Sequence, residues 1–394
     1  MKVYMTRQPI FNCDGSVYAY DLLYSGEKTA NSGGDVTHDF FGLDVKSILS
    51  GAKVFIGFSD EFIKQGVPKM FSPEMLVVKV LADQLADGEV MKAVRELKGL
   101  GYMIALDGFE YSGTYKLLFS MCDIVTLDIK APKEELEKAA AECRGLNKLM
   151  LVKNAHTNTD ADQAKKLGCT YLQGYFFVRS VTTLSRNIQP LPANLIEIMH
   201  LMAQPEPELN DIVDVMSRDA ALCQKILKLI NSVYFGVSNK VSSINQAILA
   251  LGLDYLREWV YLMGMQKIAQ NDNVEAMRLA LLIAKFCRRL SGLIPEVSND
   301  GDAFYLMGLL SMIVLSGDRS LAQALDEFPL TNDIKKGLLR CGGTYSDVFE
   351  MSLNYVDGRW NEYDVTAAKY KLSSDKVSDL FIKCAQEIGN LNMG

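Results

Sequence analysis

The segment Ser243-Ile244-Asn245-Gln246-Ala247-Ile248-Leu249-Ala250-Leu251-Gly252 lies within the stretch that decides the fold of the second half of the chain, residues 210 to 263. Ser243 is a favourable helix N-cap and Gly252 a favourable helix end, so the segment predicts one short helix. The helix before it has apolar residues spaced i, i+4, i+7 and i+8 along one face, namely Leu222, Ile226, Leu229 and Ile230. A third helix follows, with a buried side formed by Leu256, Val260 and Met263. Short amphipathic helices with tight connections predict a compact helical domain and not a long bundle.

This stretch resembles the HDOD family, a helical output module related to HD phosphohydrolases that lacks their metal ligands. The segments that carry the resemblance are Arg218-Asp219-Ala220-Ala221-Leu222, Asn231-Ser232 and Ala247 to Gly252, and the resemblance begins at Ile188. It implies a module that binds other signalling proteins and does not turn over a substrate. We therefore expect an HDOD helical domain over residues 188–394. The pattern after Leu195 is almost entirely helical, and besides the three helices above it predicts helices at 195–202, 274–290, 303–315, 321–328, 333–340, 345–357 and 374–388.

The composition is that of an ordinary globular protein, with 49% hydrophobic and 23% charged residues among 394. The net charge is −7, and neither half has the basic surplus typical of phosphate-backbone binding, so we expect no nucleic-acid partner. The eight cysteines form no C-x-x-C pair, which argues against a zinc site. The longest stretch without charge, 303–317, is too short for a membrane span, and no signal-peptide pattern follows Met1. These features predict a cytoplasmic protein without membrane insertion.

The first 185 residues alternate between short β-rich runs and helix-like segments, which predicts a parallel sheet closed into a (β/α) barrel. The eight candidate strands are 3–8, 17–23, 54–58, 76–80, 103–106, 124–127, 149–152 and 171–174. The first two lie too close together for a helical crossover, and the turn sequence Asn12-Cys13-Asp14-Gly15 between them predicts a hairpin. One strand of the barrel should therefore be antiparallel. The predicted domains are a barrel at 1–185 and a helical domain at 188–394, joined by a short proline-containing linker.

The ends of these strands resemble the EAL domain of cyclic di-GMP phosphodiesterases. Gly168-Cys169-Thr170-Tyr171-Leu172-Gln173-Gly174-Tyr175 carries this resemblance best, and Arg7-Gln8-Pro9-Ile10-Phe11 resembles the variant found fused to an HDOD module. The resemblance implies a site at the barrel mouth, the rim formed by the C-terminal ends of the parallel strands. In the family, two divalent cations held there by hard oxygen ligands hydrolyse a phosphodiester.

This sequence departs from the family at most ligand positions. Gly57 stands in place of an Asn, and Lys79 and Lys153 stand in place of two Glu residues. The departures elsewhere are Gly108, Thr126, His156 and, where a phosphate-gripping Arg would follow the name-giving motif, Tyr24-Ser25. Ammonium groups repel a divalent cation, so we expect no bound metal, no cofactor and no catalytic residue. The remaining candidates for a ligand-binding site at the mouth are Asp21, Lys79, Asp107, Asp128, Lys153 and Gln173.

Two arrangements of the mouth lysines are compatible with the sequence. In one, Lys79 and Lys153 form ion pairs with Asp21 and Asp107, so that salt bridges replace the metals. In the other, one or both lysines extend into solvent from a rim that carries no site.

These observations predict a protein that is not an enzyme but a scaffold or adaptor in signal transduction. One alternative is a sensor that binds cyclic di-GMP or another nucleotide at the mouth without metal. The third hypothesis is an active cyclic di-GMP phosphodiesterase, and the loss of the metal ligands argues against it. The sequence leaves open the identity of the protein partner and the oligomeric state.

Overall fold

A computed structural model describes residues 3–26, 52–109, 115–179, 193–202, 207–231, 241–253, 255–257, 259–260, 263, 274–316, 325–326, 328 and 330–389. The chain divides into two compact units. The first consists of Met1–Ser180 together with Leu353–Asn390, and the second of Val181–Ser352 together with Leu391–Gly394.

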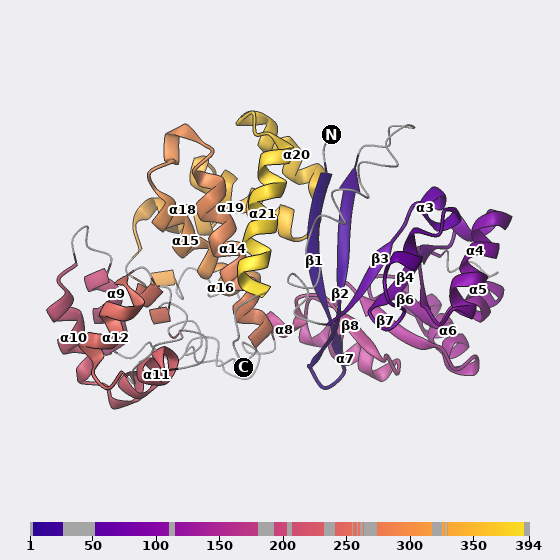
Figure 1. The fold of residues 1–394 in the computed structure, drawn as a ribbon, viewed down its shortest axis with the longest axis horizontal. Coiled ribbons are helices and arrows are strands. Elements are labelled where there is room, and N and C mark those ends of the chain that lie inside the picture. The colour runs from indigo at the N-terminus through magenta and orange to yellow at the C-terminus, as the bar shows by residue number, and fades with distance from the viewer. Residues whose placement is uncertain are drawn as a thin grey trace. The chain divides into compact units, whose positions relative to one another are not determined.

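The first unit contains a closed barrel of eight strands in sequence order (Figure 1). The antiparallel strand β1 pairs with β2 through the predicted hairpin and with β8, while all other neighbours are parallel, as predicted. Its strands are β1 (Val3–Asn12), β2 (Val17–Gly26), β3 (Lys53–Gly57), β4 (Leu76–Leu81), β5 (Met103–Asp107), β6 (Ile124–Asp128), β7 (Leu149–Lys153) and β8 (Tyr171–Gln173). All eight predicted strands are thus confirmed.

Alternate residues of each strand fill the barrel and bury its interior. The interior cluster takes one residue from each strand, namely Ile10, Ala19, Phe55, Val77, Ala105, Ile124, Leu151 and Tyr171. Because side chains alternate along a strand, residues two positions further toward the C-terminal ends of the parallel strands β2 to β8 also point inward and reach the mouth. On the antiparallel strand β1 the corresponding residue is Gln8, two positions before Ile10. The helices of the barrel are α3 (Asp60–Lys64), α4 (Gly88–Gly99), α5 (Tyr115–Met121), α6 (Lys133–Gly145), α7 (Asn158–Lys166) and α8 (Phe176–Arg179).

The second unit is helical over its described residues, and helix α12 begins and ends where the sequence predicts. Ser243 caps α12 by accepting a hydrogen bond from the backbone of Gln246, and Gly252 ends that helix with φ +80°. Ile226 and Ile230 of α11 are buried. The helices in this part are α9 (Ala193–Met202), α10 (Leu209–Ser217), α11 (Ala220–Ile230), α12 (Ile244–Leu251), α14 (Val274–Ser291), α15 (Gly301–Leu309), α16 (Ser311–Ser316), α18 (Asn332–Leu338) and α19 (Thr344–Val356). Within this described part, no helix is both long and apolar enough to cross a bilayer.

Two helix predictions need correction. The predicted helix over 303–315 is two helices, α15 and α16, which meet at Leu310. Helix α20 (Trp360–Lys369) was not predicted, and Arg359 at its N-terminus provides no side-chain cap that would have marked its start. The predicted helix at 321–328 and the linker at 180–192 lie largely or wholly outside the described residues.

The C-terminal segment, Leu353–Asn390, forms one compact unit with the barrel. Helix α21 (Ser374–Gly389) runs beside β1 (Figure 1). The side chain of Tyr4 on β1 is only 3% exposed and has ring contacts with Tyr355, Trp360 and Tyr363. The compact units therefore differ from the predicted division at residue 188, since these last helices belong to the barrel.

Tyr4 should be a principal contact between this segment and the barrel. We expect Tyr4→Ala to lower the free energy of unfolding by about 3–5 kcal/mol, because it leaves a cavity among three aromatic rings. Tyr4→Phe keeps the ring and loses the hydroxyl contacts to Asp364 and Ser374, so it should cost about 1 kcal/mol. The control is Val365→Ala on α20, where the side chain is 78% exposed. Urea unfolding followed by circular dichroism measures the three values, and equal effects for Tyr4→Ala and Val365→Ala would contradict the packing.

Candidate functional site

One ion pair joins two strands at the barrel mouth. The Nζ of Lys79 on β4 donates to Oδ1 of Asp21 on β2 at 2.7 Å. The two side chains are 15% and 8% exposed, so the pair is largely shielded from water. Gly57 on β3 lies between them in the sheet, and a Cβ built there would be 3.5 Å from Cε of Lys79. The absence of a side chain at Gly57 thus leaves room for the lysine to reach across β3.

The same carboxylate has a second partner. Gln173 at the end of β8 donates from Nε2 to Oδ2 of Asp21 and to Oε1 of Gln8, each at 3.1 Å. Gln8 faces Asp21 in the register of β1 and β2, and its own amide donates to the carbonyl of Asp357 at 3.1 Å. Asp357 also accepts from the hydroxyl of Tyr175. Both oxygens of Asp21 are therefore occupied, as a buried carboxylate requires.

A second ion pair lies further along the rim. The Nζ of Lys153 on β7 donates to Oδ1 of Asp107 on β5 at 2.6 Å, with the lysine side chain 30% exposed. Asp128 on β6 belongs to neither pair: its Oδ2 accepts from the amide of Asn154 at 2.8 Å and its Oδ1 from the backbone of Lys130 at 2.9 Å. Asn154 has a left-handed φ of +62°, a conformation that asparagine tolerates better than most residues.

These geometries decide between the two arrangements of the lysines. Both predicted ion pairs are present, and the reading in which the lysines extend into solvent is wrong. The six candidate residues divide into three groups: Asp21 with Lys79 and Gln173, Asp107 with Lys153, and Asp128 with Asn154. Their role in binding a ligand stays a prediction.

Four further residues at this rim were not identified from the sequence: Gln8, Asn154, Tyr175 and Asp357. The register of a hairpin from Asn12 to Gly15 would have placed Gln8 near Asp21. Asp357 is separated from Gln8 by 349 residues, and no local pattern connects them. Burial, and then the nearby Asp357, raises the pKa of Tyr175 well above its usual value, so Tyr175 remains a hydrogen-bond donor.

Tyr24 stands where the resemblance to EAL domains implies a phosphate-binding arginine. Its hydroxyl donates to the carbonyl of Gly57 at 2.5 Å, and burial raises its pKa to about 12. It is therefore a neutral donor that closes the connection between β2 and β3, and it offers no positive charge to a phosphate.

The side chains at the mouth do not fit a pair of divalent cations. Of the three remaining strand-end acids, Asp21 and Asp107 each have an ammonium group within 3 Å, at 2.7 and 2.6 Å, and Asp128 accepts from the amide of Asn154. Among the residues that the structure describes, no group of three or more His, Cys, Asp or Glu side chains is arranged to hold a metal ion. Two-metal chemistry needs hard anionic oxygen ligands, and the paired acids of this rim do not supply them.

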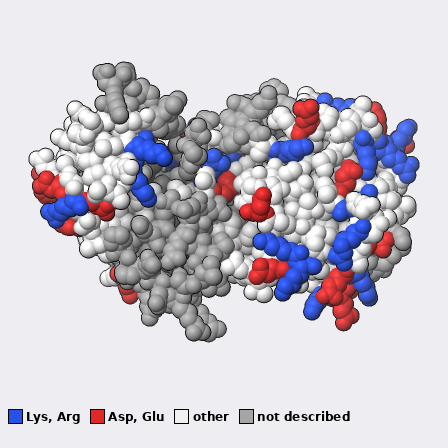
Figure 2. Space-filling view, turned by 90° about the horizontal axis from the view of Figure 1, so that it is seen from below, with Lys and Arg blue, Asp and Glu red and all other residues white. Residues whose placement is uncertain are grey.

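The charges outside the mouth do not gather into a field of one sign on the face seen in Figure 2. There, Lys and Arg side chains alternate with Asp and Glu over the described surface. Exposed ion pairs of the barrel include Lys64 with Asp87 and Lys69 with Glu96, each at 2.6 Å. Exposed pairs of this kind contribute little to stability.

We expect the pair at the mouth to behave differently from these exposed pairs. Lys79→Met leaves a buried carboxylate without its ammonium partner and should lower the free energy of unfolding by about 3 kcal/mol. The double variant Asp21→Leu/Lys79→Met removes both charges and should recover most of that loss. Lys64→Met serves as the matched control, since it breaks an exposed pair and should leave stability unchanged within error. Chemical denaturation of the four proteins tests this, and a Lys79→Met variant as stable as the control would contradict a buried, coupled pair.

Comparison with known proteins gives the following matches. Residues 188–325 match the HDOD domain family. The uncharacterized protein YuxH of Bacillus subtilis is 27% identical over 382 residues, covering 92% of each chain. The cyclic di-GMP phosphodiesterase CdgJ of Vibrio cholerae is 27% identical over 372 residues, covering 91% of this chain and 85% of that protein.

Solved structures of EAL domains match the N-terminal part of the chain. The EAL domain of FimX from Pseudomonas aeruginosa, bound to c-di-GMP, has a TM-score of 0.36 at 16% identity, covering 45% of this chain and 89% of that one. A standalone EAL protein from Vibrio cholerae, also bound to c-di-GMP, has a TM-score of 0.34 at 20% identity, covering 44% of this chain and 90% of that one. Residues 188–325 thus match the HDOD domain family, and a closed barrel of eight strands precedes them.

Proposed function

We propose that this protein is a non-catalytic component of cyclic di-GMP signalling that acts as a scaffold or adaptor for other proteins. The observation that carries the proposal is the pair of lysine–aspartate bridges at the barrel mouth, Lys79 with Asp21 and Lys153 with Asp107. The pathway comes from the resemblance to EAL domains, and the binding of partner proteins is what the match of residues 188–325 to the HDOD family implies.

Electrostatics supports the loss of metal-dependent hydrolysis. A divalent cation about 4 Å from one ammonium group is repelled by about 8 kcal/mol at an effective dielectric constant of 20, twice the value for two unit charges. A metal would also need Asp21, whose oxygens already accept from Lys79 and Gln173. This rim therefore lacks the metal ligands and the negative electrostatic potential that two-metal hydrolysis of a phosphodiester requires.

A metal-independent sensor is the second candidate. Lys153 is 30% exposed, so a phosphate could reach its ammonium group without complete burial. EAL proteins have been solved with c-di-GMP bound, which favours this nucleotide as the compound to test. Binding would require the phosphate to compete with Asp107 for the lysine, and the affinity should therefore decrease strongly with salt.

Hydrolysis assays decide whether the protein is an enzyme. We expect the full chain to leave cyclic di-GMP intact in the presence of Mg²⁺ or Mn²⁺, because the metal ligands are replaced. The named relative CdgJ is described as a phosphodiesterase and provides the positive control. Metal-dependent turnover by this chain that is lost in Asp107→Asn would overturn the proposal.

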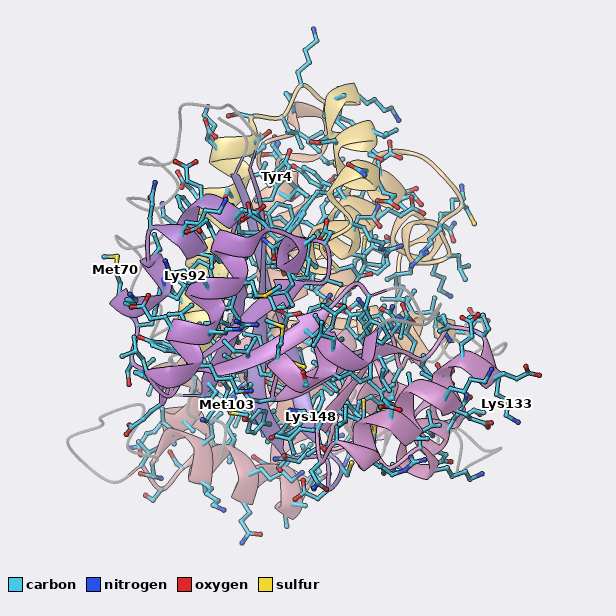
Figure 3. All side chains as sticks on the ribbon, turned by 90° about the vertical axis from the view of Figure 1, so that its right-hand side faces the viewer. Tyr4, Met70, Lys92, Met103, Lys133 and Lys148 are labelled. Carbon is cyan, nitrogen blue, oxygen red and sulfur yellow. The ribbon has the colours of Figure 1, made fainter. Side chains whose placement is uncertain are left out.

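The role of the lysines is tested by restoring the family's residues. We expect Gly57→Asn/Lys79→Glu/Lys153→Glu to bind Mn²⁺ at least tenfold more tightly than the unmodified protein, and Mn²⁺ should raise its melting temperature. The matched control is Lys92→Glu/Lys133→Glu, which makes the same two charge reversals on exposed positions of α4 and α6. Lys133 points away from the barrel in Figure 3. Equal Mn²⁺ affinity in both variants would show that the mouth lysines are not what excludes metal.

Calorimetric titration with cyclic di-GMP separates the scaffold from the sensor. Micromolar binding that weakens in Lys153→Met supports the sensor, whereas no heat at high concentration supports the scaffold.

Partner capture should use the full chain as bait, because Leu353–Asn390 packs with the barrel and a fragment beginning at residue 188 would expose that surface.

A further inference from the structure

Two cysteines that are far apart in the sequence meet at the end of the barrel opposite the mouth. The Sγ atoms of Cys13 and Cys169 are 3.6 Å apart, across a separation of 156 residues. Cys13 lies in the turn between β1 and β2, and Cys169 lies in the connection between α7 and β8. The Cys13 thiol also donates to the carbonyl of Cys169 at 3.1 Å, so the two residues are in direct contact.

The cysteines stand at the seam that closes the barrel. Strands β1 and β8 share only three register pairs, Ile10 with Gln173, Phe11 with Leu172 and Asn12 with Tyr171. By comparison, the hairpin of β1 and β2 has nine. Cys13 follows Asn12 directly and Cys169 precedes Tyr171 by two residues, so a bond between the two sulfurs would extend this short seam at its open end.

We propose that Cys13 and Cys169 form a reversible disulfide under a peroxide-class oxidant, and that this bond locks the β1–β8 seam. A disulfide requires the sulfurs to approach to about 2 Å. The required movement of roughly 1.5 Å falls on a turn whose residues Asp14, Gly15 and Ser16 are exposed, with Gly15 at φ +90°. The exposed hairpin tip can therefore adjust without disturbing the buried strands.

The reaction has a defined order and balance. Cys13 is the more accessible sulfur, while Cys169 is 8% exposed, and burial raises the pKa of the Cys169 thiol to about 12. Cys13 therefore attacks the peroxide first, forming a sulfenic acid and releasing one water. The sulfur of Cys169 then displaces hydroxide from that sulfenic acid, its proton leaves with the hydroxide as a second water, and the S–S bond forms. Two thiols lose two electrons and two protons, and one hydrogen peroxide is reduced to two waters.

The other cysteines provide contrast. Cys122, Cys143, Cys287 and Cys384 are buried, Cys223 is half-buried and Cys341 is exposed. Burial also raises the pKa of the Cys223 thiol. Burial raises the pKa of Cys122 and of Cys143 to about 12, which makes both slow to react. Cys341 is accessible to oxidants and serves as the internal control for surface reactivity.

The test uses the full-length reduced protein, treated with hydrogen peroxide and then alkylated under denaturing conditions. Before alkylation, we expect the intact mass of the oxidised protein to be lower by two hydrogens than that of the reduced protein. After alkylation, we expect two fewer alkylated thiols than in the untreated protein and a peptide that links Cys13 to Cys169. Dithiothreitol should restore all eight thiols. The oxidised form should melt roughly 5 °C higher, since the cross-link restricts the unfolded chain.

Variants make the assignment specific. Cys13→Ser and Cys169→Ser should each abolish the linked peptide and the rise in melting temperature, whereas Cys341→Ser should keep both. Peptide mapping of the unmodified protein does not depend on how the variants fold. Oxygen addition at Cys13 with Cys169 still free to be alkylated, or a link that joins another pair of cysteines, would overturn the proposal.

Discussion

The carboxylate of Asp21 is the constraint on which the barrel mouth depends. It is buried on β2, and a buried carboxylate must be hydrogen-bonded to be tolerated. Lys79 and Gln173 meet this requirement, which ties β2 to β4 on one side and to β8 on the other. Through Gln173 the same network reaches Gln8 and then the backbone of Asp357. A single acid thus organises the rim of the barrel and connects it to the C-terminal segment.

The substitution of lysines for acids changes what such a rim can do. In a two-metal site the cations compensate the charge of the acids, whereas here Asp21 and Asp107 are each paired with a lysine of the same protein. Buried ion pairs contribute little net stability compared with apolar residues, but their geometry is specific. The two pairs therefore give Asp21 and Asp107 a specific arrangement without a ligand.

The C-terminal segment adds a second level of organisation. Leu353–Asn390 belongs to the barrel unit, so the residues between 181 and 352, which include the HDOD domain, lie in sequence between two parts of one compact unit. Helix α19 begins in one unit and ends in the other. Its last turn reaches the barrel through the carbonyl of Val356, which accepts from Thr6 at 2.9 Å. The chain is consequently connected to the barrel at both ends of the helical unit.

The sequence by itself determined the closed barrel, the antiparallel first strand and the capped helices of the second unit, because strand alternation, the turn at Asn12 to Gly15 and the caps at Ser243 and Gly252 are local signals. For the mouth lysines the sequence left two arrangements open, and the tertiary structure decided that Lys79 pairs with Asp21 and Lys153 with Asp107. Only the tertiary structure decided that Gln8 and Asp357 complete the network around Asp21, that α20 and α21 cover β1, and that Cys13 lies against Cys169. These contacts join residues more than 150 positions apart, and they depend on how the chain returns to the barrel, which no local periodicity encodes.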